Sequence, residues 1–179
     1  MPRKTAASKK DEGYRIYLEQ IEALSKVANL IASGLYLDEL LRLIVQVTAE
    51  VMHSKISSLM TLDEETKELV IRATQSVSEA YNKKPNIKLG QGIAGLAASE
   101  NKPIVVIDLL KDKRYLNQDV ARSEGLVSLA SVPLAVKGKV IGVLNCYTSK
   151  KHEFTRTELK ILCALANQAA LAIENAHLA

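Results

Sequence analysis

The sequence predicts an α+β domain in which helices pack against an antiparallel sheet, and three observations lead to this fold class. Two pairs of segments alternate apolar and polar residues on either side of a short turn, as antiparallel hairpins do. Apolar residues recur at helical spacing near both ends of the chain. The chain has 179 residues, of which 47% are hydrophobic, enough for one domain with a buried core.

Composition and charge narrow the classes of function. Aromatic residues make up only 4% of the chain, which leaves little material for stacking nucleic-acid bases. Four basic residues precede the first acidic one, Asp11, and beyond them acidic and basic residues balance. No apolar run approaches the ~18 residues of a membrane span. We therefore expect a flexible basic tail over residues 1–13 and neither a nucleic-acid nor a membrane partner.

A first helix is expected over residues 14–34, where apolar residues alternate at spacings of three and four. This heptad stripe is formed by Tyr14, Tyr17, Ile21, Leu24, Ala28, Ile31 and Leu35. Two interpretations stay open, a dimer seam and an amphipathic helix lying on its own domain. Gly34 interrupts the stripe, and Asp38 is a candidate cap for a second helix that runs to roughly His53.

The middle of the chain changes to a period of two. Strands are expected at 55–63 and 68–75 around the acidic turn Asp63–Lys67, and again at 126–136 and 139–148. Pro133 lies inside the third of these strands and predicts a bulge or an edge-like break there. Both pairs are hairpins, so the sheet should be antiparallel.

The last helix opens with Thr155-Arg156-Thr157-Glu158, the pattern of a capping box. It carries two apolar stripes where covering a sheet requires one, so the second stripe should face another helix, for which the first helix is the natural candidate. Left exposed, this surface would exceed what monomers tolerate, which predicts a homodimer. The expected interface is formed by Tyr17, Ile21, Leu24, Ala28, Ile31, Ala166, Ala169 and Ile173.

A glycine-rich segment, "LGQGIAGLAASENKPIVVID", contains G-x-G-x-x-G followed by Asp108. This is close to a dinucleotide-binding fingerprint, which requires a buried parallel strand leading into the glycines. Here the segment that precedes the glycines, "YNKKPNIKL", is polar. The helix expected after the glycines runs only to about Glu100, because Pro103 stops it. A βαβ crossover needs at least ~10–12 residues, so a dinucleotide fold is excluded and the glycines serve tight backbone turns instead.

Several blocks of the chain together resemble the GAF domain family, from Leu37 to Ala176. These blocks are the glycine segment, "KDKRYLN", "SLASVPLAVKGKVIGVLNCY" and "FTRTELKILCALANQAALAIENAHL". The resemblance implies α/β/α layers with a GAF/PAS-like sheet of five or six strands. It places the terminal helices on one face of the sheet, and the short helices with a lid loop on the other. Residues 35–179 would form this domain, which ends in the long C-terminal helix.

The resemblance also implies a small-molecule pocket beneath the loop 108–125. Its expected lining is Ile93, Leu96, Val106, Asp108, Tyr115, Leu116 and Ser128. Simpler interpretations stand beside three of these: Asp108 as a turn residue, which we favour, Tyr115 as core packing and Ser128 as a structural group.

The residues offer little for catalysis. His53, His152 and His177 are scattered, which disfavours a metal site or a haem. Cys146 falls in a strand and Cys163 in the last helix, so we expect free thiols, no bilin and no methionine sulfoxide reductase, the catalytic branch of the family. Cyclic-nucleotide-binding relatives carry the motif N-K-x-F-x-x-x-D-E. This chain has only F-x-x-x-E, at Phe154 and Glu158, which does not support cyclic-nucleotide binding.

The expected function is therefore a cytoplasmic signal-sensing domain without cofactor or catalysis. It would bind a small molecule and act on an output domain, a partner kinase or a transcription regulator through dimeric terminal helices. The alternative is a non-catalytic dimerisation or interaction scaffold with a vestigial pocket, and free methionine sulfoxide reductase is a distant third.

Overall fold

A single antiparallel sheet of six strands, in the order β3-β2-β1-β6-β5-β4, forms the centre of the chain. The computed structural model describes residues 6–32 and 37–178. The strands are β1 (Ile56–Asp63), β2 (Glu68–Thr74), β3 (Ile87–Lys88), β4 (Ile104–Val106), β5 (Ser128–Val136) and β6 (Lys139–Thr148). Every neighbouring pair is antiparallel, which confirms the fold class expected from the hairpins.

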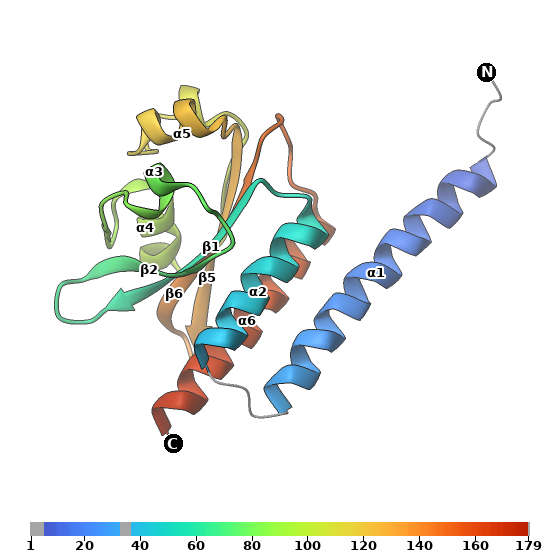
Figure 1. Ribbon diagram of the computed structural model, residues 1–179, viewed down its shortest axis with the longest axis horizontal. Helices are drawn as coiled ribbons and strands as arrows, with labels where there is room; N and C mark the ends of the chain where they lie inside the picture. The colour runs from blue at the N-terminus through green and yellow to red at the C-terminus, as the bar shows by residue number, and fades with distance from the viewer. Residues whose placement is uncertain (1–5, 33–36, 179) are drawn as a thin grey trace.

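Helices cover both faces of this sheet (Figure 1). Two long helices, α2 (Leu37–Met52) and α6 (Arg156–Leu178), lie on one face. Three short ones, α3 (Glu79–Asn82), α4 (Gly92–Glu100) and α5 (Gln118–Glu124), lie on the other, with the 3₁₀ turn η1 (Leu109–Lys111). The first helix, α1 (Ala6–Ala32), packs on α2 and α6 as an outer layer, and its N-terminal half extends away from the body (Figure 1).

Strand residues alternate between the two sides of the sheet, as their period of two requires. Leu59 of β1 and Leu144 of β6 pair with each other and pack toward the long helices. Met60 and Val143 pair next to them and pack beneath α4. Pro133 is tolerated because β4 pairs with β5 only as far as Ser131, and the register shifts just beyond it, between Leu134 and Ala135.

The capping box of α6 is present. The Glu158 amide donates to Thr155 Oγ1 at 3.1 Å, and the Thr155 amide donates to Glu158 Oε1 at 2.9 Å. Both apolar stripes of α6 are used inside the chain, one against the sheet and one against α2, which is the main helical neighbour of α6. Ala166, Ala169 and Ile173 are buried in this core, so their expected place in a dimer interface is wrong.

The first helix differs from its prediction in two ways. It begins at Ala6, so the segment from there to residue 13 is helical rather than a flexible tail; its alanine, lysine and glutamate residues favour helix. Its inner half buries Val27 against the domain, with Ala23 and Leu24 beside it.

The inner half of this helix thus lies on its own domain, while the dimer seam stays a prediction for the outer half. The outer half leaves large apolar side chains exposed, namely Tyr14, Ile16, Tyr17, Leu18 and Ile21, and Ala28 is exposed as well. The side chain of Ile31 lies outside the described residues.

Candidate functional site

The glycine segment brings the chain from the sheet edge into α4. Gly90 and Gly92 adopt positive φ angles of 84° and 64°. Gly95 packs so closely on the strand before it that a methyl group there would overlap the carbonyl oxygen of Lys88. The glycines therefore seat a short helix on the sheet, the turn-forming role that the sequence predicted for them.

The loop after β4 folds into a compact lid. The side-chain amide of Gln118 donates to the carbonyl oxygens of Leu109, Asp112 and Tyr115 at 2.9, 3.0 and 3.1 Å. The guanidinium of Arg114 donates hydrogen bonds to the Asp112 carboxylate, the shortest from Nη2 to Oδ2 at 2.7 Å. These hydrogen bonds lower the pKa of the Asp112 carboxyl. One glutamine amide thus holds η1, the loop and α5 together.

Three residues expected to line the pocket meet beneath this lid. Ile93, Val106 and Tyr115 are buried in one cluster between the lid and the sheet. The same cluster includes Ile56, Tyr81, Leu109, Ala121, Leu126, Leu129 and Tyr147. Because side chains fill this space with the lid closed, a ligand in the predicted pocket would have to displace part of the lid.

The other expected lining residues lie elsewhere. Asp108 caps η1 by accepting from the Leu110 amide at 3.2 Å, the turn role that we favoured for it. Ser128 donates to the Ile107 carbonyl at 2.5 Å and accepts from the His152 amide at 2.9 Å, so its hydroxyl is used structurally. Leu116 is exposed over Gly92, and Leu96 is half-buried outside the cluster.

A row of buried polar residues crosses the sheet beneath the lid cluster. Ser58, Asn145 and Ser131 stand opposite one another on β1, β6 and β5. Ser131 Oγ donates to Asn145 Oδ1 at 2.6 Å, and Asn145 Nδ2 donates to Ser58 Oγ at 3.3 Å. Ser58 Oγ lies 2.6 Å from the hydroxyl of Tyr81, which comes from α3. The row connects three strands to a short helix of the lid side.

Three tyrosines continue this network. The ring of Tyr147 stands edge-on to the rings of Tyr81 and Tyr115, with centroids 5.4 and 6.2 Å away. Tyr115 OH donates to Tyr147 OH at 3.3 Å. Desolvation raises the pKa of all three, most strongly for Tyr147, so the hydroxyls stay neutral.

Two polar atoms in this region have no hydrogen-bond partner. One is the ammonium nitrogen of Lys84, which follows α3 and is 8% exposed. It lies 4.5 Å from the ring centroid of Tyr81 and 5.9 Å from that of Tyr147. The other is Oε1 of Gln118, the oxygen of the lid amide. Buried polar groups are almost always satisfied, so these two atoms mark the region as a candidate binding site.

Sequence reasoning missed Lys84 and the polar row. "YNKK" resembles a solvated loop, and only the i, i+3 spacing of Tyr81 and Lys84 within a helical turn could have brought them together. The row had a clearer signal, because Ser131 and Asn145 interrupt mostly apolar runs in β5 and β6.

The cysteines and histidines are not part of this site. Cys146 and Cys163 are free, as expected. Cys146 points to the long-helix side, where burial raises its pKa to about 12. His152 Nε2 lies 2.8 Å from Glu158, while His53 and His177 are exposed. Within residues 6–32 and 37–178, no three His, Cys, Asp or Glu residues group to hold a metal.

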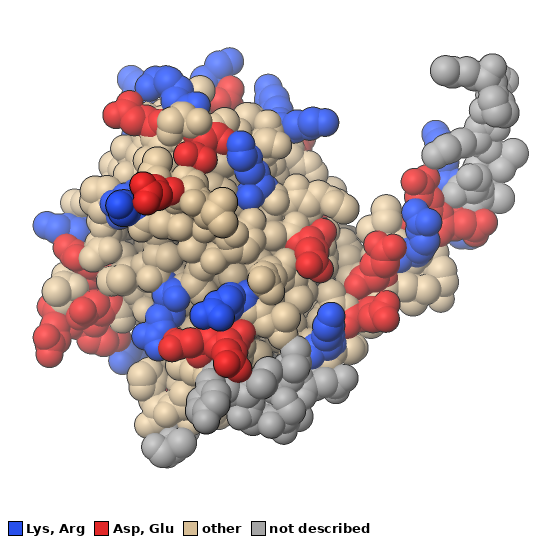
Figure 2. Space-filling view, in the orientation of Figure 1, with Lys and Arg blue, Asp and Glu red and all other residues tan. Residues whose placement is uncertain are grey.

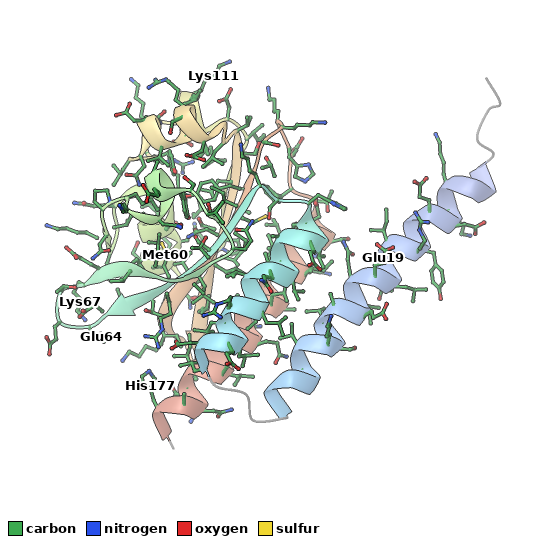
Figure 3. All side chains as sticks on the ribbon, in the orientation of Figure 1. Glu19, Met60, Glu64, Lys67, Lys111 and His177 are labelled. Atoms are coloured by element: carbon green, nitrogen blue, oxygen red, sulfur yellow. The ribbon has the colours of Figure 1, made fainter. Side chains whose placement is uncertain are left out.

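A hollow of about 420 Å³ lies on the other side of the sheet, near the C-terminal end of α6. Apolar residues of α2, β1, β6 and α6 line it, and Arg72, Lys139 and His177 are among its polar residues. Figure 3 labels His177 and Glu64 at this end of the molecule. Lys67 and Lys139, 2.8 and 3.3 Å from Glu64, lower the pKa of its carboxyl. The Glu64–Lys139 ion pair connects the two hairpins here.

The face of the molecule drawn in Figure 2 shows no preference for one sign of charge. Lys and Arg alternate with Asp and Glu over the face drawn in Figure 2, both on the domain and along α1. No helix in the described part of the chain has the length and apolar character to cross a membrane.

Comparison with known proteins identifies related domains. Residues 34–174 match the GAF domain family. The methyl sulfide methyltransferase-associated sensor of Methanosarcina acetivorans is 30% identical over 166 residues, covering 90% of this chain, which spans 17% of that protein's length.

Solved structures show the same fold. The GAF domain of a phosphoenolpyruvate-protein phosphotransferase from Coxiella burnetii has a TM-score of 0.81 at 23% identity, over 90% of this chain and 96% of that one. The free methionine-R-sulfoxide reductase of Neisseria meningitidis, solved with its substrate, has a TM-score of 0.77 at 23% identity, over 89% and 90%.

Proposed function

The chain belongs to the GAF domain family, and on this premise we propose that it is a sensory module that binds a small molecule beneath the lid. The observation that carries the proposal is the buried polar site between sheet and lid. A polar row crosses three strands on this side of the sheet, and the Lys84 ammonium nitrogen and the Gln118 side-chain oxygen are buried there without a hydrogen-bond partner. Unsatisfied buried groups of this kind are costly, so a ligand that satisfies them is strongly favoured.

Binding beneath the lid would reach the helices through the sheet. The Leu109 amide of the lid donates to the Val127 carbonyl at 2.8 Å, next to the start of β5. The opposite face of β5 packs against α6, and α1 packs against α6 in turn. We propose that displacement of the lid on binding shifts this stack, and that homodimeric α1 helices pass the change to an output domain, partner kinase or transcription regulator. The shift can be no larger than the ligand's differential affinity for the two arrangements.

A sensing role is better supported than catalysis. The relative from Methanosarcina acetivorans is a sensor. Although a reductase shares the fold, Cys146 lies on the far side of the sheet from the lid and its thiol is held protonated. We therefore propose an intracellular, non-catalytic module. An interaction scaffold, the alternative, would leave the polar site without a use.

Native mass spectrometry of the purified protein tests the proposal. We expect a small-molecule adduct after incubation with a metabolite extract, and its loss in Ser131→Val, which breaks the polar row. Thr48→Val is the matched control, since Thr48 is also buried but lies on α2, bonded to the Ile44 carbonyl at 2.7 Å. An adduct that persists in Ser131→Val, or is absent throughout, would favour the scaffold.

Hydrogen exchange of the same samples tests transmission. Occupied protein should show altered exchange in α1 and α6 relative to protein stripped of the adduct. Unchanged exchange in both helices would contradict the signalling half of the proposal.

A further inference from the structure

Lys84 is the only buried lysine among the described residues, and its position is not explained by packing alone. A lysine normally keeps its ammonium in water by extending its flexible side chain. Its neighbour Lys83 does so: that side chain is 77% exposed, and its nitrogen lies 3.8 Å from Glu79. The Lys84 nitrogen instead turns inward over two tyrosine rings.

Nothing in the described part of the chain neutralises this charge. Lys84 forms no ion pair there, and burial alone lowers its pKa to about 8, so it remains largely protonated at neutral pH. Tyr81 and Tyr147 cannot serve as phenolate counterions, because burial raises their pKa values. The rings offer a cation–π contact, which compensates only part of the cost of removing an ammonium from water.

The groups around Lys84 are donors as well. Ser58 and Tyr81 share one hydrogen bond between two hydroxyls, and Asn145 donates its amide to Ser58. When Tyr81 is the donor of the shared bond, the Ser58 hydroxyl hydrogen stays available. A cation with three N–H donors beside a spare O–H donor is suited to a group that only accepts hydrogen bonds and carries negative charge.

We propose that Lys84 and the Ser58–Tyr81 pair bind an anionic group, a carboxylate or a phosphate, of the small molecule sensed beneath the lid. This inference rests on the proposed function and specifies its ligand class. The anion supplies the partner that the buried ammonium lacks, and the rearranged lid covers the ion pair. Because the ion pair is desolvated, it contributes far more to the free energy of ligand binding than an ion pair with an exposed lysine would.

Thermal unfolding with small anions as probes tests the assignment. Sodium acetate represents carboxylates and inorganic phosphate represents phosphates, each compared with sodium chloride at equal ionic strength and pH 7. We expect at least one probe to raise the Tm of the wild type and of Lys83→Met by roughly 5 °C near saturation. Lys84→Met should show no such rise, and which probe acts identifies the acid class.

A second measurement works on the unmutated chain and guards against a misfolded variant. Nitrogen NMR of the lysine ammonium groups should show the pKa of Lys84 rising when the effective anion is added, while that of Lys83 stays fixed. A merely structural lysine would show no change. Equal Tm shifts in Lys84→Met and wild type, or a Lys84 resonance that no probe moves, would overturn the assignment.

The outcomes separate this inference from the proposed function. A neutral adduct that depends on Ser131, without any anion effect at Lys84, rejects the anionic class and keeps the sensor. Anion binding at Lys84 without altered exchange in α1 and α6 keeps the inference and rejects transmission.

Discussion

At the level of single residues, Lys84 makes the free energy of unfolding depend on pH. Its pKa is about 8 in the folded chain against an ordinary value of 10.5, because burial disfavours the charge. Between these two values the unfolded chain holds more protons, so stability rises with pH across this window, and below about pH 8 the folded chain carries the full penalty.

The first prediction compares wild type with Lys84→Met by urea denaturation from pH 7 to 9.5. At pH 7 the variant should be more stable, by up to about 3 kcal/mol, and this difference should shrink as the pH rises. The tyrosines and Cys146 titrate in both proteins, so their effects cancel. Lys83→Met should show no pH-dependent difference, and a constant difference for Lys84→Met would contradict the prediction.

Gly95 carries the second prediction. Gly95→Ala should destabilise the domain by roughly 1–3 kcal/mol, because the added methyl group overlaps the Lys88 carbonyl. Gly13→Ala is the control: it has open space around it in α1 and should be neutral or stabilising by up to ~1 kcal/mol. Denaturant midpoints measure both, and equal effects would show that Gly95 is not sterically constrained.

Residue patterns predicted part of the site. Ile93, Val106 and Tyr115 meet beneath the lid as expected, because apolar residues on a short helix, a strand and a loop have only one core to enter there. Lys84 could not be predicted in the same way. Its burial depends on how α3 sits against β6, a tertiary contact that leaves no periodic trace in "YNKK".

At the level of elements, the hairpins and α6 were predicted nearly to the residue, because turn chemistry and capping act over a few neighbouring positions. β1, β2 and β6 all lie within the expected segments. Helix partners were predicted less well. The two apolar stripes of α6 predict that it packs against both the sheet and another helix. They do not predict that this helix is mainly α2 rather than α1.

The capping box gives the third prediction, for α6. Thr155→Ala should destabilise the domain by about 1 kcal/mol, since it leaves the Glu158 amide without its acceptor at the start of the helix. Thr155→Ser should restore most of the loss, and chemical denaturation measures both. If the alanine variant were as stable as wild type, solvent would satisfy the helix end equally well.

At the level of the whole molecule, α1 divides into two parts with different partners. Its inner half is anchored by Val27 on its own domain. Its outer half extends from the body with Tyr14 62%, Tyr17 51% and Ile21 41% exposed (Figure 1). Apolar side chains gathered along one projecting helix mark an interaction surface. A second copy of this helix offers the same stripe, and pairing the two about a twofold axis buries both.

The last prediction is therefore a homodimer held by α1 alone, rather than by α1 with the buried residues of α6. Light scattering should give the wild type twice the mass of the 19.6 kDa chain. Ile21→Glu with Ala28→Glu should give a folded monomer, because both exposed positions then place charge in the seam. Arg15→Gln with Lys26→Gln changes the net charge equally on other faces of α1 and should stay dimeric. A wild type of single-chain mass, or a dimer that survives the glutamates, would remove α1 as the seam, and the sensor would then have to signal through a different surface.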